Sequence, residues 1–295
     1  MIRFLLPAHW RMPGYTVLCL GVLLCLVVGY MGWQYGAVRR STAPNPEDGR
    51  VAGGIYTSAY FGLSYPLPPG WIEGNAGPAP SRSGYYVLSM LTPSGEQNGA
   101  IVIAAQDMFF ASEPVGDAGT AAERFGGAMS AIDGMTIDHD PSTERIAGRR
   151  FGRVDYSGVG LYRAMYATDI RCHIVSFNLT ARDPDTLARL AQHVSNHSVA
   201  TSTSGRASVP ACLENYAVPE NLIRRALPVT ADHKFMPVPV RIIIGTDGSV
   251  QHVHVIRAPA ERRQSIEAAL WSWQFKPYRV DGRAVEVETG LLMQF

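Results

Sequence analysis

The stretch WSWQFKPYRVDGRAVEVETGLLMQF, residues 271–295, decides how the last part of the chain folds. Its paired tryptophans close an apolar helical pattern over 261–273. Pro277 cannot continue that helix, because its ring blocks the preceding turn. An Asp-Gly pair then turns the chain. The alternating residues that follow predict a strand over 284–295.

The preceding stretch, MPVPVRIIIGTDGSVQHVHVIRAP, residues 236–259, predicts a β-hairpin. Apolar residues fill both arms, which we place at 238–244 and 250–256. The TDGS sequence between them supplies the turn, with Gly248 free to adopt a positive φ. The order of elements is therefore hairpin, helix and strand.

At these residues the segment 212–295 resembles the C-terminal domain of TonB, the energy transducer of Gram-negative envelopes. The matching pieces are VRIIIGTDGSV, the helix ending in WSWQFKP, and the strand in DGRAVEVETGLLMQF. That family shows a hydrophobic strand running into a DG or NG turn, a helix closing on WxFxP, and a final strand after DGxPV. The resemblance implies a small β-hairpin–helix–strand domain.

The resemblance also implies a binding site, because the last strand of that family lies at an accessible part of its sheet. An exposed strand edge offers unpaired N–H and C=O groups to a partner strand. We therefore expect strand addition by an envelope protein, an outer-membrane receptor being one such partner. The alternative, a fully paired strand that serves only the fold, stays open. The expected edge comprises Glu286, Val287, Glu288, Thr289, Gly290, Leu291, Leu292, Met293, Gln294 and Phe295.

Two departures from the family argue against energy transduction. Energised members carry a histidine in their membrane helix, and the corresponding stretch here has none. Their long proline-rich spacer is replaced here by a segment with strand and helix patterns. Coupling to a proton-driven motor is thus doubtful. The function we expect is partner binding in the service of transmembrane transport, and the alternative is a non-energised adaptor that recognises its partner through residues 55–199.

The N-terminal part contains no charged residue from Met12 to Val38. A helix over its densest 19 residues would be about 28 Å long, close to the hydrocarbon thickness of a bilayer. We predict a transmembrane helix at 15–37, with a cleaved signal peptide as the rival. The arginines flanking it are nearly balanced, so we choose the ordinary signal-anchor arrangement. In this arrangement the protein is anchored in the inner membrane, residues 1–14 lie in the cytoplasm, and the chain after the helix lies in the periplasm.

Gly21, Cys25 and Gly29 lie four residues apart, on one face of that predicted helix. Small residues at this spacing let two membrane helices approach closely, which would support a homodimer. The alternative is that glycine is common in membrane helices in any case.

Two polar segments, 38–54 and 200–211, lack an apolar period and are predicted to be linkers. Between them, residues 55–199 show the patterns of several consecutive strands, with one helix between two groups of strands and a second helix at the end of the segment. This order predicts an antiparallel sheet and an α+β fold class for the chain. The opening IYTSAYFGLSYPLPPGW, residues 55–71, is similar to the entry of PsbP-like domains, a resemblance that implies no catalytic residue.

The remaining chemistry-bearing residues predict no active site, cofactor or metal. A net charge of +1 gives no reason to expect a nucleic-acid partner. His252 and His254 share a strand face, but a third metal ligand is not evident nearby. Cys172 and Cys212 would bridge in an oxidising periplasm, the alternative being a free buried Cys172.

Overall fold

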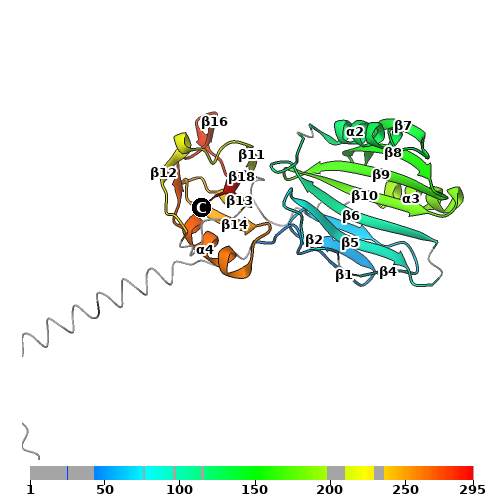
Figure 1. Cartoon of the computed structure of the whole chain (residues 1–295), viewed down its shortest axis with the longest axis horizontal. Helices are drawn as coiled ribbons and strands as arrows, with labels where there is room; N and C mark the ends of the chain where they lie inside the picture. The colour runs from blue at the N-terminus through cyan, green and yellow to red at the C-terminus, as the bar shows by residue number, and fades with distance from the viewer. Residues whose placement is uncertain are drawn as a thin grey trace, which may run out of the picture. The chain divides into compact units, whose positions relative to one another are not determined.

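The computed structural model describes Cys25 and residues 43–75, 77–95, 98–113, 116–197, 210–228 and 236–294. Residues Ser41–Phe295 form one compact unit. Within the described ranges the secondary structure is mostly β (Figure 1).

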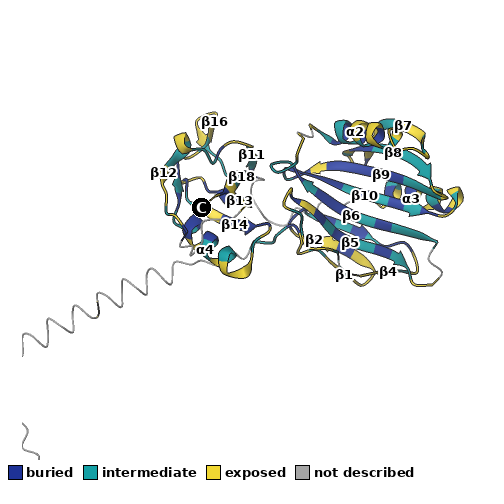
Figure 2. Ribbon diagram, in the orientation of Figure 1, coloured by how far each residue is buried: buried dark blue, intermediate teal, exposed yellow. Residues whose placement is uncertain are grey.

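The largest element is a seven-stranded sheet whose pairs are all antiparallel. Six of its strands have 9 to 12 residues and one has three. Buried and more exposed side chains alternate along the central strands, as Figure 2 shows, which is the pattern of a sheet packed on a core. In spatial order the strands are β4 (Trp71–Glu73), β5 (Tyr85–Pro93), β6 (Gly99–Asp107), β10 (His173–Ala181), β9 (Leu161–Ile170), β8 (Arg149–Gly158) and β7 (Met135–Ile146).

Further elements cover this sheet. A three-stranded antiparallel sheet of β1 (Arg50–Ala52), β2 (Ile55–Ser58) and β3 (Leu63–Pro66) shares its main apolar core. Helix α3 (Pro184–Asn196) adds Leu190 and Val194 to that core. Helix α2 (Ala118–Ser130) packs beside β7 and β8, where Ala122 contacts a smaller cluster around Val154.

The C-terminal part contains a four-stranded sheet in the order β11 (Ala211–Cys212), β18 (Val287–Met293), β13 (Val238–Ile244) and β14 (Val250–Val255). Helix α4 (Ala260–Trp271) packs Ile266 and Leu270 against one face of it. Short elements complete this part. They are η1 (Pro219–Asn221), β12 (Leu222–Arg224), β15 (Gln274–Phe275), β16 (Arg279–Val280) and β17 (Arg283–Ala284).

The predicted α+β class with an N-terminal membrane helix is wrong for what the structure describes. Three short helices accompany a predominantly β structure between residues 43 and 294 of the described part. No helix among the described residues is long and apolar enough to span a membrane, and 15–37 lies outside them except for Cys25. The predicted class assumed that the two helices of the middle region form a layer of their own. In the structure they flank one large sheet.

Strand β7 shows why the sheet was underestimated. In the sequence, Asp138-His139-Asp140 before Pro141 is typical of a solvated turn. In the structure β7 continues through these residues, and its pairing with β8 shifts register on either side of His139. Such a bulge lets an edge strand accommodate proline without ending.

Candidate functional site: the outer edge of β18

Strand β18 lies between β11 and β13, and its two sides differ greatly in how far they are paired. On one side β13 pairs with it along all seven residues, from Val287 to Met293. On the other side β11 pairs with Val287 and Glu288 alone. We call this second side the outer edge of β18.

The backbone groups of Gly290 and Leu292 point to the outer edge. The carbonyl oxygens of Glu286 and Glu288 accept hydrogen bonds on this side, from Ala211 N at 2.8 Å and Leu213 N at 3.1 Å. Backbone direction alternates along a strand, so the even-numbered residues 290 and 292 face the same way. Among the described residues, no strand pairs with them there.

A groove of about 480 Å³ runs along this unpaired stretch, and we call it the β18 groove. Residues 290–294 form one side, while Phe109 and Phe110 are among the residues on its walls. Trp273 lines it too, and the indole Nε1 is held by donating to Ala226 O at 2.7 Å. The groove therefore joins free backbone groups to apolar side-chain surface.

Gly290 permits a close approach of the loop after β6. A Cβ at this position would lie 2.7 Å from Phe109 Cβ and 2.9 Å from Phe110 Cζ. A larger residue would displace both rings. Phe109 also lies over Arg241, whose guanidinium carbon is 4.6 Å from the ring centroid, a cation–π contact.

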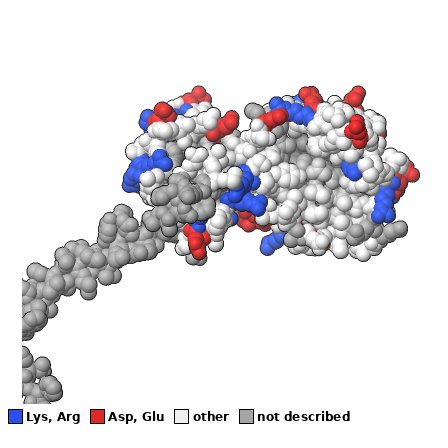
Figure 3. Space-filling view, in the orientation of Figure 1, with Lys and Arg blue, Asp and Glu red and all other residues white. Residues whose placement is uncertain are grey.

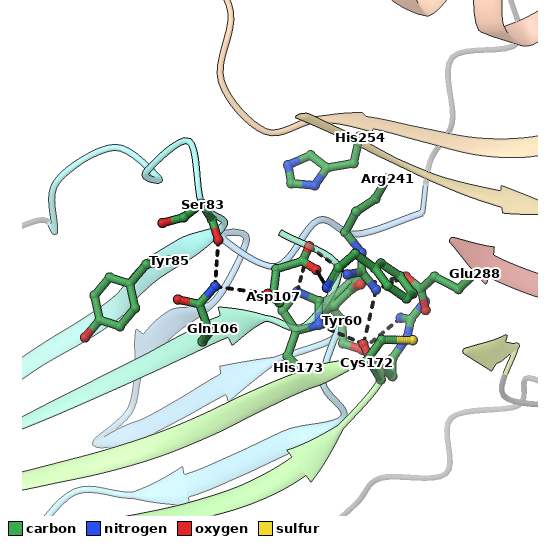
Figure 4. A network of polar contacts seen from close by, with 12 residues as sticks. Tyr60, Ser83, Tyr85, Gln106, Asp107, Cys172, His173, Arg241, His254 and Glu288 are labelled. Carbon is green, nitrogen blue, oxygen red and sulfur yellow. Dashed lines mark hydrogen bonds and ion pairs between the residues drawn. The ribbon is translucent and has the colours of Figure 1, made fainter. Parts of the chain in front are cut away.

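Behind Phe109, in contact with its ring through Arg241, lies a buried ionic group that we call the charged cluster (Figure 4). Arg241 Nη1 lies 2.7 Å from Asp107 Oδ2, and Arg241 Nη2 lies 3.2 Å from Glu288 Oε1. Arg171 Nη2 lies 3.5 Å from Glu288 Oε2, and the Tyr60 hydroxyl donates to Glu288 at 2.7 Å. Two cations thus balance two carboxylates, as buried charges require.

The surroundings fix the protonation states of this cluster. Burial acts to raise the pKa of Glu288, but Arg241 and Arg171 outweigh it, so the pKa lies below its usual value. Burial disfavours the charge of Arg241, yet Tyr60, Asp107 and Glu288 hold its pKa above normal. Burial raises the pKa of Asp107, although the charge of Arg241 opposes this. The Arg241–Glu288 pair is therefore ionic at neutral pH.

His173 lies beside the cluster and is completely buried. Burial, followed by the charge of Arg241, holds the pKa of His173 well below 6.5. Its Nδ1 lies 2.7 Å from Arg171 O, a carbonyl that can only accept, so the neutral ring carries its proton there.

The structure places the other predicted residues as follows. Cys172 and Cys212 form a disulfide, with their Cα atoms 5.7 Å apart. Cys25 is an exposed free cysteine, whereas Gly21 and Gly29 lie outside the described residues. His254 Nε2 lies 3.0 Å from Glu47 Oε1, and no group of three or more metal-binding side chains occurs among the described residues.

The ten residues predicted as one binding edge have different environments. Val287 and Met293 are buried in the core under α4, and Thr289 is fully buried. Glu288 joins the charged cluster. Leu292 is 59% exposed, and Phe295 lies outside the described residues. The unpaired edge among the described residues is thus centred on Gly290 and Leu292.

Sequence reasoning missed the charged cluster altogether. One signal was available, since Arg241 is the single charged residue in the strand VPVRIII. A buried strand carries such a residue only if a partner neutralises it. Its partners come from β6 and β18, far apart in the sequence, so nothing in the local pattern identified them.

Comparisons with known proteins add little to this geometry. No family model matches the chain, and no curated protein does. The solution structure of cyanobacterial PsbP (CyanoP) from Synechocystis sp. PCC 6803 is similar with a TM-score of 0.36 and 16% identity, covering 50% of this chain and 95% of that one. This supports a weak PsbP-like resemblance of the middle region and carries no functional conclusion. None of these comparisons shows the predicted resemblance to TonB.

Proposed function

We propose that this protein is a non-catalytic binding protein of the cell envelope. In this proposal the outer edge of β18 captures an extended segment of a partner protein as an added strand. The observation that carries it is the pair of unpaired backbone positions, Gly290 and Leu292, beside the β18 groove. Strand addition takes its affinity from main-chain hydrogen bonds and its specificity from neighbouring pockets.

The surface chemistry is consistent with this mode of binding. On the face shown in Figure 3, acidic and basic side chains are interspersed. Recognition at the groove then depends on backbone pairing and apolar contact. Trp273 and the two phenylalanines offer such contact, while Arg225, whose guanidinium carbon lies 5.5 Å from the Trp273 ring, offers a charge at the same place.

The disulfide between Cys172 and Cys212 supports an exported location, because such bonds persist in oxidising compartments. Together with the resemblance of 212–295 to TonB, this favours an envelope partner. We extend the proposal to a role in transport, with an outer-membrane receptor as the expected class of partner. The charged cluster plays no catalytic part in it.

The experiment that tests the proposal compares Leu292→Pro with Leu292→Ala in the full chain. Proline removes an N–H that points to the outer edge, whereas alanine keeps that N–H and removes only the side chain. Partners are captured in cells by a photo-cross-linking residue placed at Gln294, which is exposed and lines the groove. We expect Leu292→Pro to lower capture by about tenfold, as the loss of one ladder hydrogen bond implies, and Leu292→Ala to lower it less.

Equal capture by the proline variant and the parent, with both still folded by circular dichroism, would contradict the proposal. Thr289→Pro is unsuitable for this test. Residue 289 faces β13 and its side chain is fully buried, so the change would damage the fold itself.

A second candidate is an adaptor that recognises its partner through the middle region. A hollow of about 430 Å³ favours it, with Trp71, Pro68, Pro69 and His193 among its lining residues. Trp71→Ala discriminates between the two. Partner capture lost in Trp71→Ala and retained in Leu292→Pro would favour the adaptor.

A further inference from the structure

The hairpin between β9 and β10 has an unusual tip. Two-residue turns with positive φ at both positions normally end in glycine, and four turns among the described residues do so. These are Gly53-Gly54, Ala147-Gly148, Val159-Gly160 and Asp281-Gly282. The tip between β9 and β10 instead consists of Arg171 at φ 48° and Cys172 at φ 59°, neither of which is glycine.

Both residues of this tip contact the C-terminal sheet. Arg171 pairs with Glu288 of β18, and its Nη1 donates to Tyr60 O at 2.9 Å. Cys172 is bonded to Cys212 of β11. Strained positions persist where the surrounding contacts fix them, and they cluster at functional sites. The tip therefore serves as an attachment point for the strand that covers part of β18.

Strand β11 itself makes few contacts besides the disulfide, whereas the segment after it is anchored to β18 at Thr289, whose Oγ1 accepts from Tyr216 N at 3.4 Å and donates to Glu214 O at 3.3 Å. Strand β11 is two residues long, and its flanking hydrogen bonds to β18 are those from Ala211 N and Leu213 N. A strand this short is not stable by itself. Its partner residues, Val287 and Glu288, directly continue the unpaired stretch at Gly290 and Leu292.

We propose that the Cys172–Cys212 disulfide is a redox latch that holds β11 on β18 and so limits the length of the free edge. A dithiol attacks the disulfide at Cys212, which is exposed, and the Cys172 thiolate leaves. The second thiol of the reductant displaces Cys212 and closes its own disulfide. Two electrons and two protons thus pass from the dithiol to the two cysteines.

Release of β11 would extend the free edge from residues 290–293 back to 286. The charged cluster would remain, since its contacts do not pass through sulfur. Reduction is therefore expected to free β11 without detaching the C-terminal sheet. This inference rests on the proposed function for its biological meaning, because the longer edge would accept a longer partner strand.

The test is amide hydrogen exchange on the full chain, before and after reduction with dithiothreitol. We expect exchange at the amides of Ala211, Leu213 and Glu288 to rise by about tenfold or more, as local opening predicts, whereas the Val287 amide faces β13 and should keep its protection. Peptides from β13 and from β6 should keep their protection. Unchanged exchange at 211–213 would overturn the latch. Loss of protection throughout Ser41–Phe295 would overturn it too, because the bond would then be a general stabiliser.

The double variant Cys172→Ser, Cys212→Ser should show the exchange pattern of the reduced parent without added reductant. Arg150→Met, a change at an exposed ion pair, is the matched control and should retain the oxidised pattern. The readout involves no partner, so it separates the two proposals. If the outer edge captured a partner but amide exchange did not change on reduction, the proposed function would stand and the latch would be ruled out.

Discussion

Arg241 links the two halves of the described unit, and its position explains much of the site. It is fully buried, lies between two carboxylates, and carries the Phe109 ring on its face. A buried ion pair contributes little net stability when intact, but breaking it leaves an uncompensated charge in a medium of low polarity. The strand that carries Arg241 was predictable from sequence, whereas the role of its side chain was not.

Arg241→Met should lower the free energy of unfolding by about 3–5 kcal/mol, because Asp107 and Glu288 lose their counter-charge. Urea denaturation measures this. Arg150→Met provides the control, since Arg150 pairs with Asp117 at 3.0 Å with both side chains about half exposed. Exposed pairs contribute far less. Equal effects of the two changes would contradict a buried, neutralised cluster.

His173 predicts how stability depends on pH. The folded state keeps it neutral at pH values where the unfolded chain binds a proton, so the unfolded chain binds more protons below pH 6.5. Stability should therefore decline as the pH falls below that value, by up to about 1.4 kcal/mol per pH unit from this group. His173→Gln should reduce the slope by this amount in urea titrations at several pH values. A variant with the parent's slope would show that His173 is protonated in the folded protein.

At the scale of the element, successive residues of β18 face different sides and so contribute to three different parts of the structure. One set of side chains enters the core under α4, Glu288 enters the charged cluster, and the backbone of Gly290 and Leu292 forms the outer edge. The sequence predicted a strand over 284–295, and the structure has it at Val287–Met293. Which residues face outward could not be predicted, because this depends on the pairing of β11.

The hairpin of β13 and β14 was predicted closely. Its strands were expected at 238–244 and 250–256, and they occupy Val238–Ile244 and Val250–Val255. Gly248 has a φ of +81°, and Asp247 Oδ1 accepts from Ser249 N at 2.9 Å. Local turn chemistry determined this element, which is why the sequence was sufficient.

Gly248→Ala tests a contact that the sequence did not reveal. A Cβ there would lie 2.0 Å from Phe275 O, whereas one at Gly282, with a similar φ of +78°, meets open space. Gly282→Ala should cost about 1 kcal/mol of stability from the backbone conformation alone. Gly248→Ala should cost at least about 1 kcal/mol more, because the turn must move away from β15. Equal costs in thermal unfolding would rule out this close approach.

At the scale of the whole molecule, individual strands could be predicted from the sequence, but their assembly into sheets could not. The repeated alternation over residues 85–181 indicated strands, yet it did not show that six strands of this range form one sheet together with β4. The start of the first sheet at Arg50 lies in a segment predicted as a linker, because three residues are too few to show a period. Long-range pairing of this kind leaves no local pattern.

The disulfide and the charged cluster within Ser41–Phe295 also join residues that lie far apart in the sequence. The disulfide joins residues 40 apart, and the charged cluster joins β6, the β9–β10 tip, β13 and β18. A bridge between the two cysteines could be put forward from the sequence, with a free buried Cys172 as the alternative, and the structure has the bridge. The ionic partners could not be predicted, since charged residues are common and their burial depends on the fold.

The most direct test of strand addition is amide exchange at residues 290–292 in the complex with a captured partner. We predict that the amides of Gly290 and Leu292 exchange about tenfold more slowly when the partner is bound, because both gain a hydrogen bond at the outer edge. The amide of Leu291, which faces β13, should change little. Slower exchange at Gly290 and Leu292 alone would establish an added strand. Unchanged exchange at both, with the partner bound, would contradict the central claim and place the contact elsewhere.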